Sequence, residues 1–278
     1  MKVTFFGTRG SLPSPGPSTT RYGGNTSCLG VGNEAGQRLV LDAGSGIRVA
    51  GQTFGPELKR VDVLLTHLHM DHIQGLGFFA PLYTPGVEVH FWGPPSTTHS
   101  LRKRLARYLS PPLFPVRFRE VPSKVICHDL STDSFEIGDF RVRAHLITHP
   151  GPTLGYRIES DGRSMAYLPD HEPQLGCQGG LPRDEWLSGF SIAEGADLLI
   201  HDAQYTPDEY VQRVGWGHCT PELAVRYAEI VEARRLLFFH HDPGRTDDQL
   251  EQVCAEASAL HRGEIGIAAA AEADTYEV

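Results

Sequence analysis

Short apolar runs separated by turn-forming residues recur along the whole chain. Runs with the length and character of β-strands occupy residues 2–7, 27–31, 37–41, 61–65, 87–92, 140–147, 154–159, 164–168, 197–200 and 236–239. Helices are predicted at residues 97–109, 221–231 and 247–260. Thr220 and Pro221 mark the start of the second helix, because Thr side chains cap helices and Pro suits the first helical position. Strands and helices recur in both halves, which predicts two β-sheets with helices outside, in one α/β domain spanning residues 1–278.

Composition narrows the class of protein further. Of the 278 residues 40% are hydrophobic and 21% are charged, as in an ordered globular chain. The five cysteines are scattered and form no CxxC pair, which argues against a disulfide framework and against a thiolate zinc site. Residues 1–10 lack the apolar core of a signal peptide, and no apolar run approaches the ~20 residues of a transmembrane helix. We therefore expect a cytoplasmic protein without a membrane partner.

The charge balance bears on the choice of partner. The formal net charge is −9, with 34 acidic and 25 basic residues. Proteins that grip nucleic acid nonspecifically present a basic face. The acidic balance therefore argues against long nucleic acid as the main partner, and it leaves room for a local basic patch.

The histidines point to a metal site. Of the 14 histidines, three stand in the string His67-x-His69-x-Asp71-His72, directly after the apolar run 61–65. His67 and His69 face the same way in extended backbone, while the next two residues follow at the turn and can face a second position. Imidazole and carboxylate ligands together suit Zn, Mn or Fe. The string therefore predicts a site for divalent metal.

Further ligands are predicted where other strands end. A site that holds two metal ions needs about seven protein ligands, so three more must come from elsewhere in the chain. One candidate follows each of three later predicted strands, namely His149, Asp170 and His240. His241 is the rival of His240, because strand alternation lets only one of two neighbours face the metals.

This combination resembles the metallo-β-lactamase superfamily, whose hydrolases share a four-layer αββα sandwich of two mixed β-sheets flanked by helices. The His-x-His-x-Asp-His string is the family signature, and the resemblance covers nearly the whole chain. It implies that Asp42 is the early strand-end Asp of the family. It also implies two divalent ions, with Zn expected first and Mn or Fe as alternatives. One ion would be held by His67, His69 and His149 and the other by Asp71, His72 and His240, with Asp170 bridging.

Two later stretches are similar to ribonuclease Z, the tRNA 3′-processing branch of this superfamily. Residues 149–158 (HPGPTLGYRI) resemble the His…Gly-Tyr-Arg-Ile run of that branch. Residues 217–220 (GHCT) resemble its Gly-His-Ser-Thr, with Cys219 in place of Ser. The N-terminal residues 7–11 and 21–27 are similar to cyclic-phosphate phosphodiesterases of the same branch.

The resemblance also implies catalytic roles. In the ribonuclease Z branch the His of the second stretch assists phosphodiester cleavage. His218 would accordingly stabilise developing charge or protonate the leaving oxygen, supported by Asp202. Asp71 or Asp170 could orient the metal-activated hydroxide that attacks phosphorus.

The region between His72 and His149 affects the predicted substrate. The long Gly/Pro arm with which ribonuclease Z holds tRNA is not evident there. The chain has instead the basic stretch 101–107, which could steer an anionic substrate or form a solvated helix face. Residues 110–115, with an exposed Phe114, could wall the pocket or form a homodimer contact. A small anionic phosphodiester is therefore the expected substrate.

We thus predict a binuclear metal-dependent phosphodiesterase that cleaves a cyclic nucleotide or another small phosphodiester. The alternatives are a lactonase or β-lactamase-type hydrolase and an RNA 3′-end processing endonuclease. A di-iron redox protein is disfavoured, because such relatives usually carry Glu where this chain has His69. A non-catalytic sensor is disfavoured too, because the apparent ligand set is complete.

Overall fold

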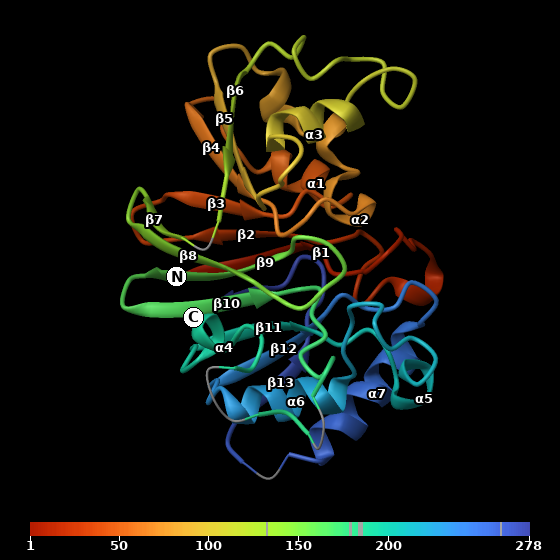
Figure 1. The fold of residues 1–278 in the computed structure, drawn as a ribbon. Coiled ribbons are helices and arrows are strands. Elements are labelled where there is room, and N and C mark those ends of the chain that lie inside the picture. Colours follow the sequence, from red (N-terminus) through yellow and green to blue (C-terminus); the bar gives the residue numbers. More distant parts are fainter. Residues whose placement is uncertain (132, 178–179, 183–185, 262) are drawn as a thin grey trace.

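Two β-sheets packed face to face form the centre of the molecule (Figure 1). The computed structural model describes residues 1–131, 133–177, 180–182, 186–261 and 263–278. Within these residues each sheet has seven strands. In spatial order the first sheet is β14 (Thr275–Glu277), β1 (Lys2–Gly7), β2 (Cys28–Gly32), β3 (Arg38–Leu41), β4 (Arg60–Leu64), β5 (Glu88–Gly93) and β6 (Lys124–Asp129). The second is β13 (Gly266–Ala269), β12 (Arg235–Phe239), β11 (Leu198–Asp202), β10 (Arg163–Leu168), β9 (Leu154–Ser160), β8 (Phe140–Leu146) and β7 (Asp133–Ile137).

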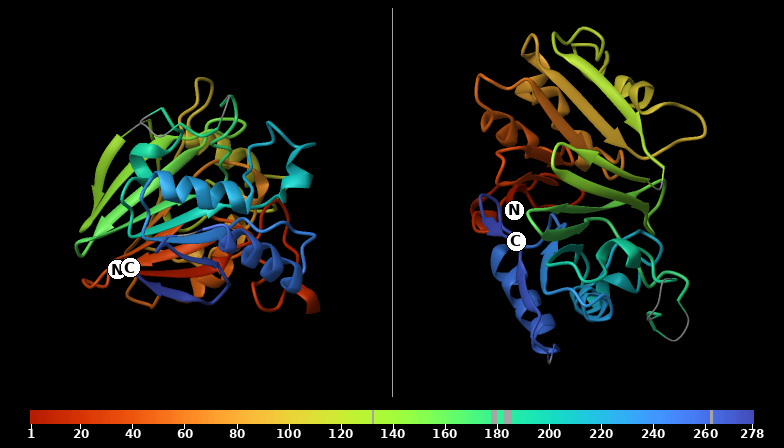
Figure 2. Two further views of the ribbon diagram at one scale, coloured as in Figure 1. Left: turned by 90° about the horizontal axis from the view of Figure 1, so that it is seen from below. Right: turned by 90° about the vertical axis from the view of Figure 1, so that its left-hand side faces the viewer.

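Both sheets are mixed and follow the same plan. In the first sheet β3 to β6 run parallel, while β14, β1 and β2 pair antiparallel. In the second sheet β10 to β13 run parallel, while β7, β8 and β9 pair antiparallel. Parallel neighbours require crossover connections, which bring helices onto the outer faces. The antiparallel pair of β14 with β1 places the two chain ends side by side (Figure 2).

Helices cover the outer face of each sheet and complete four layers. On the first sheet lie α1 (Ile47–Gln52) and α3 (Leu101–Tyr108), and on the second lie α4 (Phe190–Ala193), α6 (Pro221–Ile230) and α7 (Asp247–Ala259). Two short helices, α2 (Met70–Ile73) and α5 (Pro207–Tyr210), and three 3₁₀ turns, η1 (Pro17–Thr19), η2 (Leu76–Phe78) and η3 (Ala80–Tyr83), lie in connecting segments. The predicted αββα architecture is therefore confirmed.

The inner faces of the two sheets form a shared apolar core. Val3 and Phe5 of β1 point inward and are fully buried, as strand alternation requires. The ring of Phe5 lies 6.0 Å from that of Phe239 on the other sheet. Burying one such side chain stabilises the fold by roughly 1.5–3 kcal/mol. This core holds the ends of the strands of both sheets in a fixed relation at one edge, where the predicted site residues lie.

Helix starts and edge strands account for most differences from the predicted elements. The helix predicted at 97–109 begins only at Leu101, because the Ser100 side chain caps it by accepting a hydrogen bond from the Lys103 amide. Thr220 caps α6 in the predicted way, with Pro221 at its first position. Four strands, β6, β7, β13 and β14, were not predicted. They lie at or next to sheet edges, where a regular apolar pattern is not needed. In the described part of the chain no helix is long and apolar enough to cross a membrane.

Candidate metal centre

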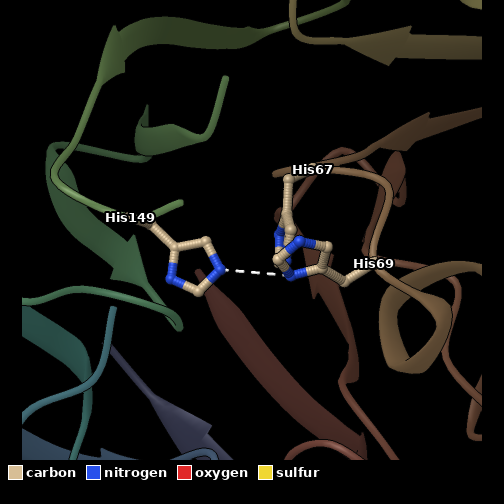
Figure 3. A group of neighbouring side chains, drawn as sticks. All are labelled: His67, His69 and His149. Atoms are coloured by element: carbon tan, nitrogen blue, oxygen red, sulfur yellow. Dashed lines mark hydrogen bonds between the residues drawn. The ribbon is translucent and has the colours of Figure 1, made fainter. Parts of the chain in front are cut away.

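Three histidines predicted to share one ion lie together in space. His67 and His69 follow β4, and His149 follows β8 of the other sheet (Figure 3). One ring nitrogen from each lies within 4.8 Å of the others, and His149 Nε2 is 3.2 Å from His69 Nδ1. His67 Nε2 is buried and has no hydrogen-bond partner among the described residues. A buried polar atom left in this way costs about 1–3 kcal/mol unless a ligand occupies it.

The other predicted ligands form a second group beside the first. Asp71 and His72 lie on α2, Asp170 follows β10, and His240 follows β12. All four are buried, and their ligand atoms lie within 4.8 Å of one another. His240 Nε2 is 3.1 Å from Asp71 Oδ2, and His72 Nε2 is 2.9 Å from Asp170 Oδ1.

Asp170 faces both groups. Its Oδ2 atom lies 3.3 Å from His240 Nε2, 3.7 Å from His67 Nε2 and 3.8 Å from His149 Nε2. One carboxylate reaches ligand atoms on either side in this way, as a residue shared by two adjacent cations would. The predicted ligands His67, His69, Asp71, His72, His149, Asp170 and His240 are thus all brought to one place.

The chemistry of these donors fits divalent ions. The groups contain only imidazole and carboxylate ligands, a set that suits Zn and other first-row metals. The Nε2 atoms of His72 and His240 approach to 3.4 Å, and a cation between them would accept both lone pairs. The donor set therefore fits the two divalent ions that the resemblance implies.

Asp42 fixes the ring of His72 from behind. Its carboxylate is fully buried and accepts hydrogen bonds from His72 Nδ1 at 2.9 Å, the Thr66 amide at 2.8 Å and the Tyr167 hydroxyl at 2.9 Å. A carboxylate only accepts, so His72 carries a proton on Nδ1, and Nε2 is the ring atom left to bind a cation in the second group. Asp42 has φ +58°, a strained backbone that is tolerated at functional strand ends.

The rings of His149 and His240 are oriented in the same manner. His149 Nδ1 donates to the carbonyl of Gly217 at 2.8 Å, and His240 Nδ1 lies 3.0 Å from Gln204 Oε1. Each contact directs Nε2 toward the cluster. The amide of Ser11 donates to Asp71 Oδ2 at 2.7 Å. Gln204 carries no local sequence signal, because its partner His240 lies 36 positions further along the chain.

The carboxylates of the cluster are held ionised by their surroundings. Burial raises the pKa of Asp170, but the nearby imidazoles of His240 and His72 outweigh it, so the pKa lies well below its usual range. The pKa of Asp71 is lowered for the same reason, with His72 as the largest opposing influence. Ionised carboxylates are the form that binds metal.

His218 and Asp202 form a pair beside the two groups. Asp202 Oδ2 accepts from His218 Nδ1 at 2.7 Å, and Asp202 also accepts from the amides of Gln204 and Cys219. The ring of His218 stacks on His240, with centroids 4.9 Å apart, and lies 5.3 Å from that of His149. Burial lowers the pKa of His218, but Asp202 outweighs it and the pKa is raised to about 8. The predicted partnership of these two residues is therefore present in the structure.

The remaining histidines of the strand ends face elsewhere. His241 donates from Nε2 to the Ala270 carbonyl at 2.8 Å, and burial lowers its pKa to about 3. The structure thereby places His240, not His241, in the cluster. His171 and His201 bond to each other at 2.9 Å behind the centre.

One end of the basic helix α3 reaches the segment that follows α2. Arg102, Lys103 and Arg107 of α3 are exposed, and the Tyr108 hydroxyl donates to the Gln74 carbonyl just after α2. The expectation of an exposed Phe114 is wrong. Its ring is partly buried, because it packs over Gly77 and against the core of the first sheet.

Comparisons with known proteins agree with this geometry. A family model described as "Beta-lactamase superfamily domain" matches residues 37–241. Ribonuclease Z of Natronomonas pharaonis is 26% identical, and the match covers 86% of each chain.

Two solved structures share the fold. The metallo-β-lactamase fold protein YhfI from Bacillus subtilis has a TM-score of 0.70 at 20% identity, covering 99% of this chain and 98% of its own. A diphosphatase from the PhnP family has a TM-score of 0.67 at 19% identity, covering 100% and 97%. The expectation against long nucleic acid loses support, because a similar protein is a ribonuclease. The chain belongs to the beta-lactamase superfamily of metallo-β-lactamase fold hydrolases, in its ribonuclease Z-like branch.

Proposed function

We propose that this hydrolase is a binuclear phosphodiesterase that acts on small phosphodiesters such as cyclic nucleotides. The observation that carries the proposal is the His218–Asp202 pair beside two adjoining ligand groups. Cleavage of a phosphodiester requires a proton for the leaving oxygen, and a second acid–base group near the metals meets that requirement.

The proposed roles of the residues follow from their contacts. His67, His69 and His149 would hold one divalent ion, Asp71, His72 and His240 the other, and Asp170 both. When bound, such a pair of ions lowers the pKa of a bound water and neutralises the phosphoryl oxygens. Asp71 would orient the attacking water, since its carboxylate lies at the centre of the second group.

His218 would supply the proton to the leaving group. Its Nδ1 is occupied by Asp202, so Nε2 is the atom that remains to face the substrate. Asp202 holds the ring in place and stabilises its protonated form. We propose Zn as the metal, because the ligands are imidazoles and carboxylates without thiolate. Mn and Fe remain the alternatives to be compared.

RNA 3′-end processing is the second candidate. Two observations favour it: the similarity to ribonuclease Z and the exposed cations Arg102, Lys103 and Arg107 on α3, whose last residue contacts the segment after α2. Cations of this kind contact phosphates without reading sequence. A longer RNA would cross α3, whereas a cyclic nucleotide would not need it.

The test is a substrate panel with the metal-reconstituted protein. It comprises bis-p-nitrophenyl phosphate, 2′,3′- and 3′,5′-cyclic nucleotides, an RNA with a 3′ extension, a homoserine lactone and a β-lactam. We expect the phosphodiesters to be cleaved and His218→Ala to lower their turnover by about 100-fold or more. His261→Ala is the matched control, because His261, which follows α7, contacts Glu229 of α6 and none of the proposed ligands. Equal turnover of the phosphodiesters by His218→Ala and by wild type would refute the proposal. Cleavage of the lactone or the β-lactam alone would refute it as well.

A further inference from the structure

A fully buried carboxylate next to the proposed bridging ligand has no part in the metal groups. Glu172 lies two residues after Asp170 and is 0% exposed. It accepts hydrogen bonds from the Tyr210 hydroxyl at 2.6 Å, the Gly215 amide at 2.8 Å and the Gly217 amide at 2.7 Å. All three donors belong to the segment 206–217, here called the strap, which carries α5. Within the described part of the chain, the hydrogen bonds of this carboxylate therefore all go to one loop.

The strap in turn contacts two residues of the site. The Gly217 carbonyl accepts from His149 Nδ1 at 2.8 Å, and the next residue in the chain is His218. Gly217 has φ +90°, and a Cβ there would lie 2.2 Å from His149 Nδ1. Only a glycine lets the backbone pass so close to the imidazole.

Glu172 is also tied to His149 through the backbone. Its amide donates to the Thr148 carbonyl at 2.9 Å, so the acid and the strand end that carries His149 move together. The outer part of the strap is less restrained, since Val211, Val214 and Trp216 expose between 55% and 75% of their surface. A loop with so much exposed apolar surface needs an internal anchor to keep one conformation.

We propose that Glu172 is a positioning residue that holds the strap so that Gly217 orients His149 and presents His218. The role of His218 in this inference rests on the proposed function, whereas the link to His149 does not. Because the Gly217 carbonyl can only accept, it keeps the proton of His149 on Nδ1 and the Nε2 lone pair in the first ligand group. One carboxylate thereby supports a proposed metal ligand and a proposed acid at once.

Glu172→Gln tests this with little change of shape. Gln has one acceptor oxygen in place of two, so its amide nitrogen must face the N–H of Gly215 or of Gly217. We expect the affinity for one of two Zn ions to fall about 10–100-fold, and that for the other to stay unchanged. Hydrogen exchange should rise in the strap and in residues 147–151. With a phosphodiester substrate, kcat should fall while KM stays close to wild type.

Tyr210→Phe is the matched control. It removes one bond to Glu172 and leaves both glycine amides in place, so both Zn affinities should stay near wild type. Glu172→Asp is the second variant if Glu172→Gln does not fold. It keeps a carboxylate, but its side chain is one methylene shorter and no longer reaches the strap amides.

Two outcomes would overturn the inference. One is wild-type affinity for both ions with unchanged exchange in the strap, whatever the melting temperature. The other is an equal loss of affinity at both ions, which would indicate general destabilisation. If the wild-type protein cleaves no phosphodiester, the proposed function fails, and the zinc and exchange measurements still decide the role of Glu172.

Discussion

Replacing Asp42 with Asn would test how the proposed second metal group depends on its support. Asn keeps the size of the side chain and tolerates the left-handed backbone at this position. The amide oxygen must stay with the Thr66 amide, which can only donate, so the amide nitrogen faces His72 Nδ1 and the Tyr167 hydroxyl. The hydroxyl can turn to accept. His72 must then move its proton to Nε2, the atom that faces the cluster.

The size of the effect follows from these contacts. Leaving a buried donor without an acceptor costs about 1–3 kcal/mol. Since 1.4 kcal/mol corresponds to a factor of ten, and changes behind metal ligands typically cost 10–100-fold, one Zn should bind about 10–100-fold more weakly. The metal-free protein should change less, because Asn also removes a buried charge.

Competition with a chromophoric chelator measures both Zn affinities. Asp62→Asn is the matched control, since Asp62 is 4% exposed and accepts from Trp92 Nε1 on β5, away from the cluster. Two Zn ions bound by Asp42→Asn as tightly as by wild type would refute the reasoning about the tautomer of His72.

Three further predictions use other parts of the structure. Arg9→Leu should lower the free energy of unfolding by about 3–5 kcal/mol in urea titrations, because it removes a buried guanidinium that pairs with Asp247 3.5 Å away and donates to the carbonyls of Gly23, Asp242 and Arg245; a loss under about 1 kcal/mol would contradict this. Gly10→Ala should weaken Zn binding, since its Cβ would lie 2.3 Å from His240 Nδ1, whereas Gly16→Ala meets nothing within 4 Å and should not. Zn at 100 times its dissociation constant should stabilise the protein, first freed of metal with a chelator, by about 2.7 kcal/mol in thermal unfolding. An unchanged melting temperature would exclude a metal site in the folded protein.

The site could be predicted from the sequence wherever its signal is local. His67, His69, Asp71 and His72 stand within six positions of one another after a buried strand, so spacing alone indicates a ligand group. His240 and His241 could not be separated in that way. Alternation says only that they face opposite sides, and the choice is made by the φ of +58° at His240 and by the Ala270 carbonyl that accepts from His241.

Hydrogen bonds between residues far apart in the sequence could not be predicted. Tyr167 reaches Asp42 across 125 positions, and Glu172 reaches Gly217 across 45. Nothing in the local pattern marks such pairs, because tertiary packing creates them. The short strand β14 could not be predicted for a related reason, since it is defined by pairing with β1 at the other end of the chain.

The origin of the ligands in both sheets has a consequence for the lifetime of the folded state. The string 67–72 follows the first sheet, whereas His149, Asp170 and His240 follow strands of the second. Two bound ions would act as a cross-link between the two sheets. The sheets could then separate only after the ligands of one sheet had dissociated from the metals. Metal release and global unfolding should then share one slow step. In excess chelator, which captures each released ion, the rate of unfolding should therefore equal the rate of metal release.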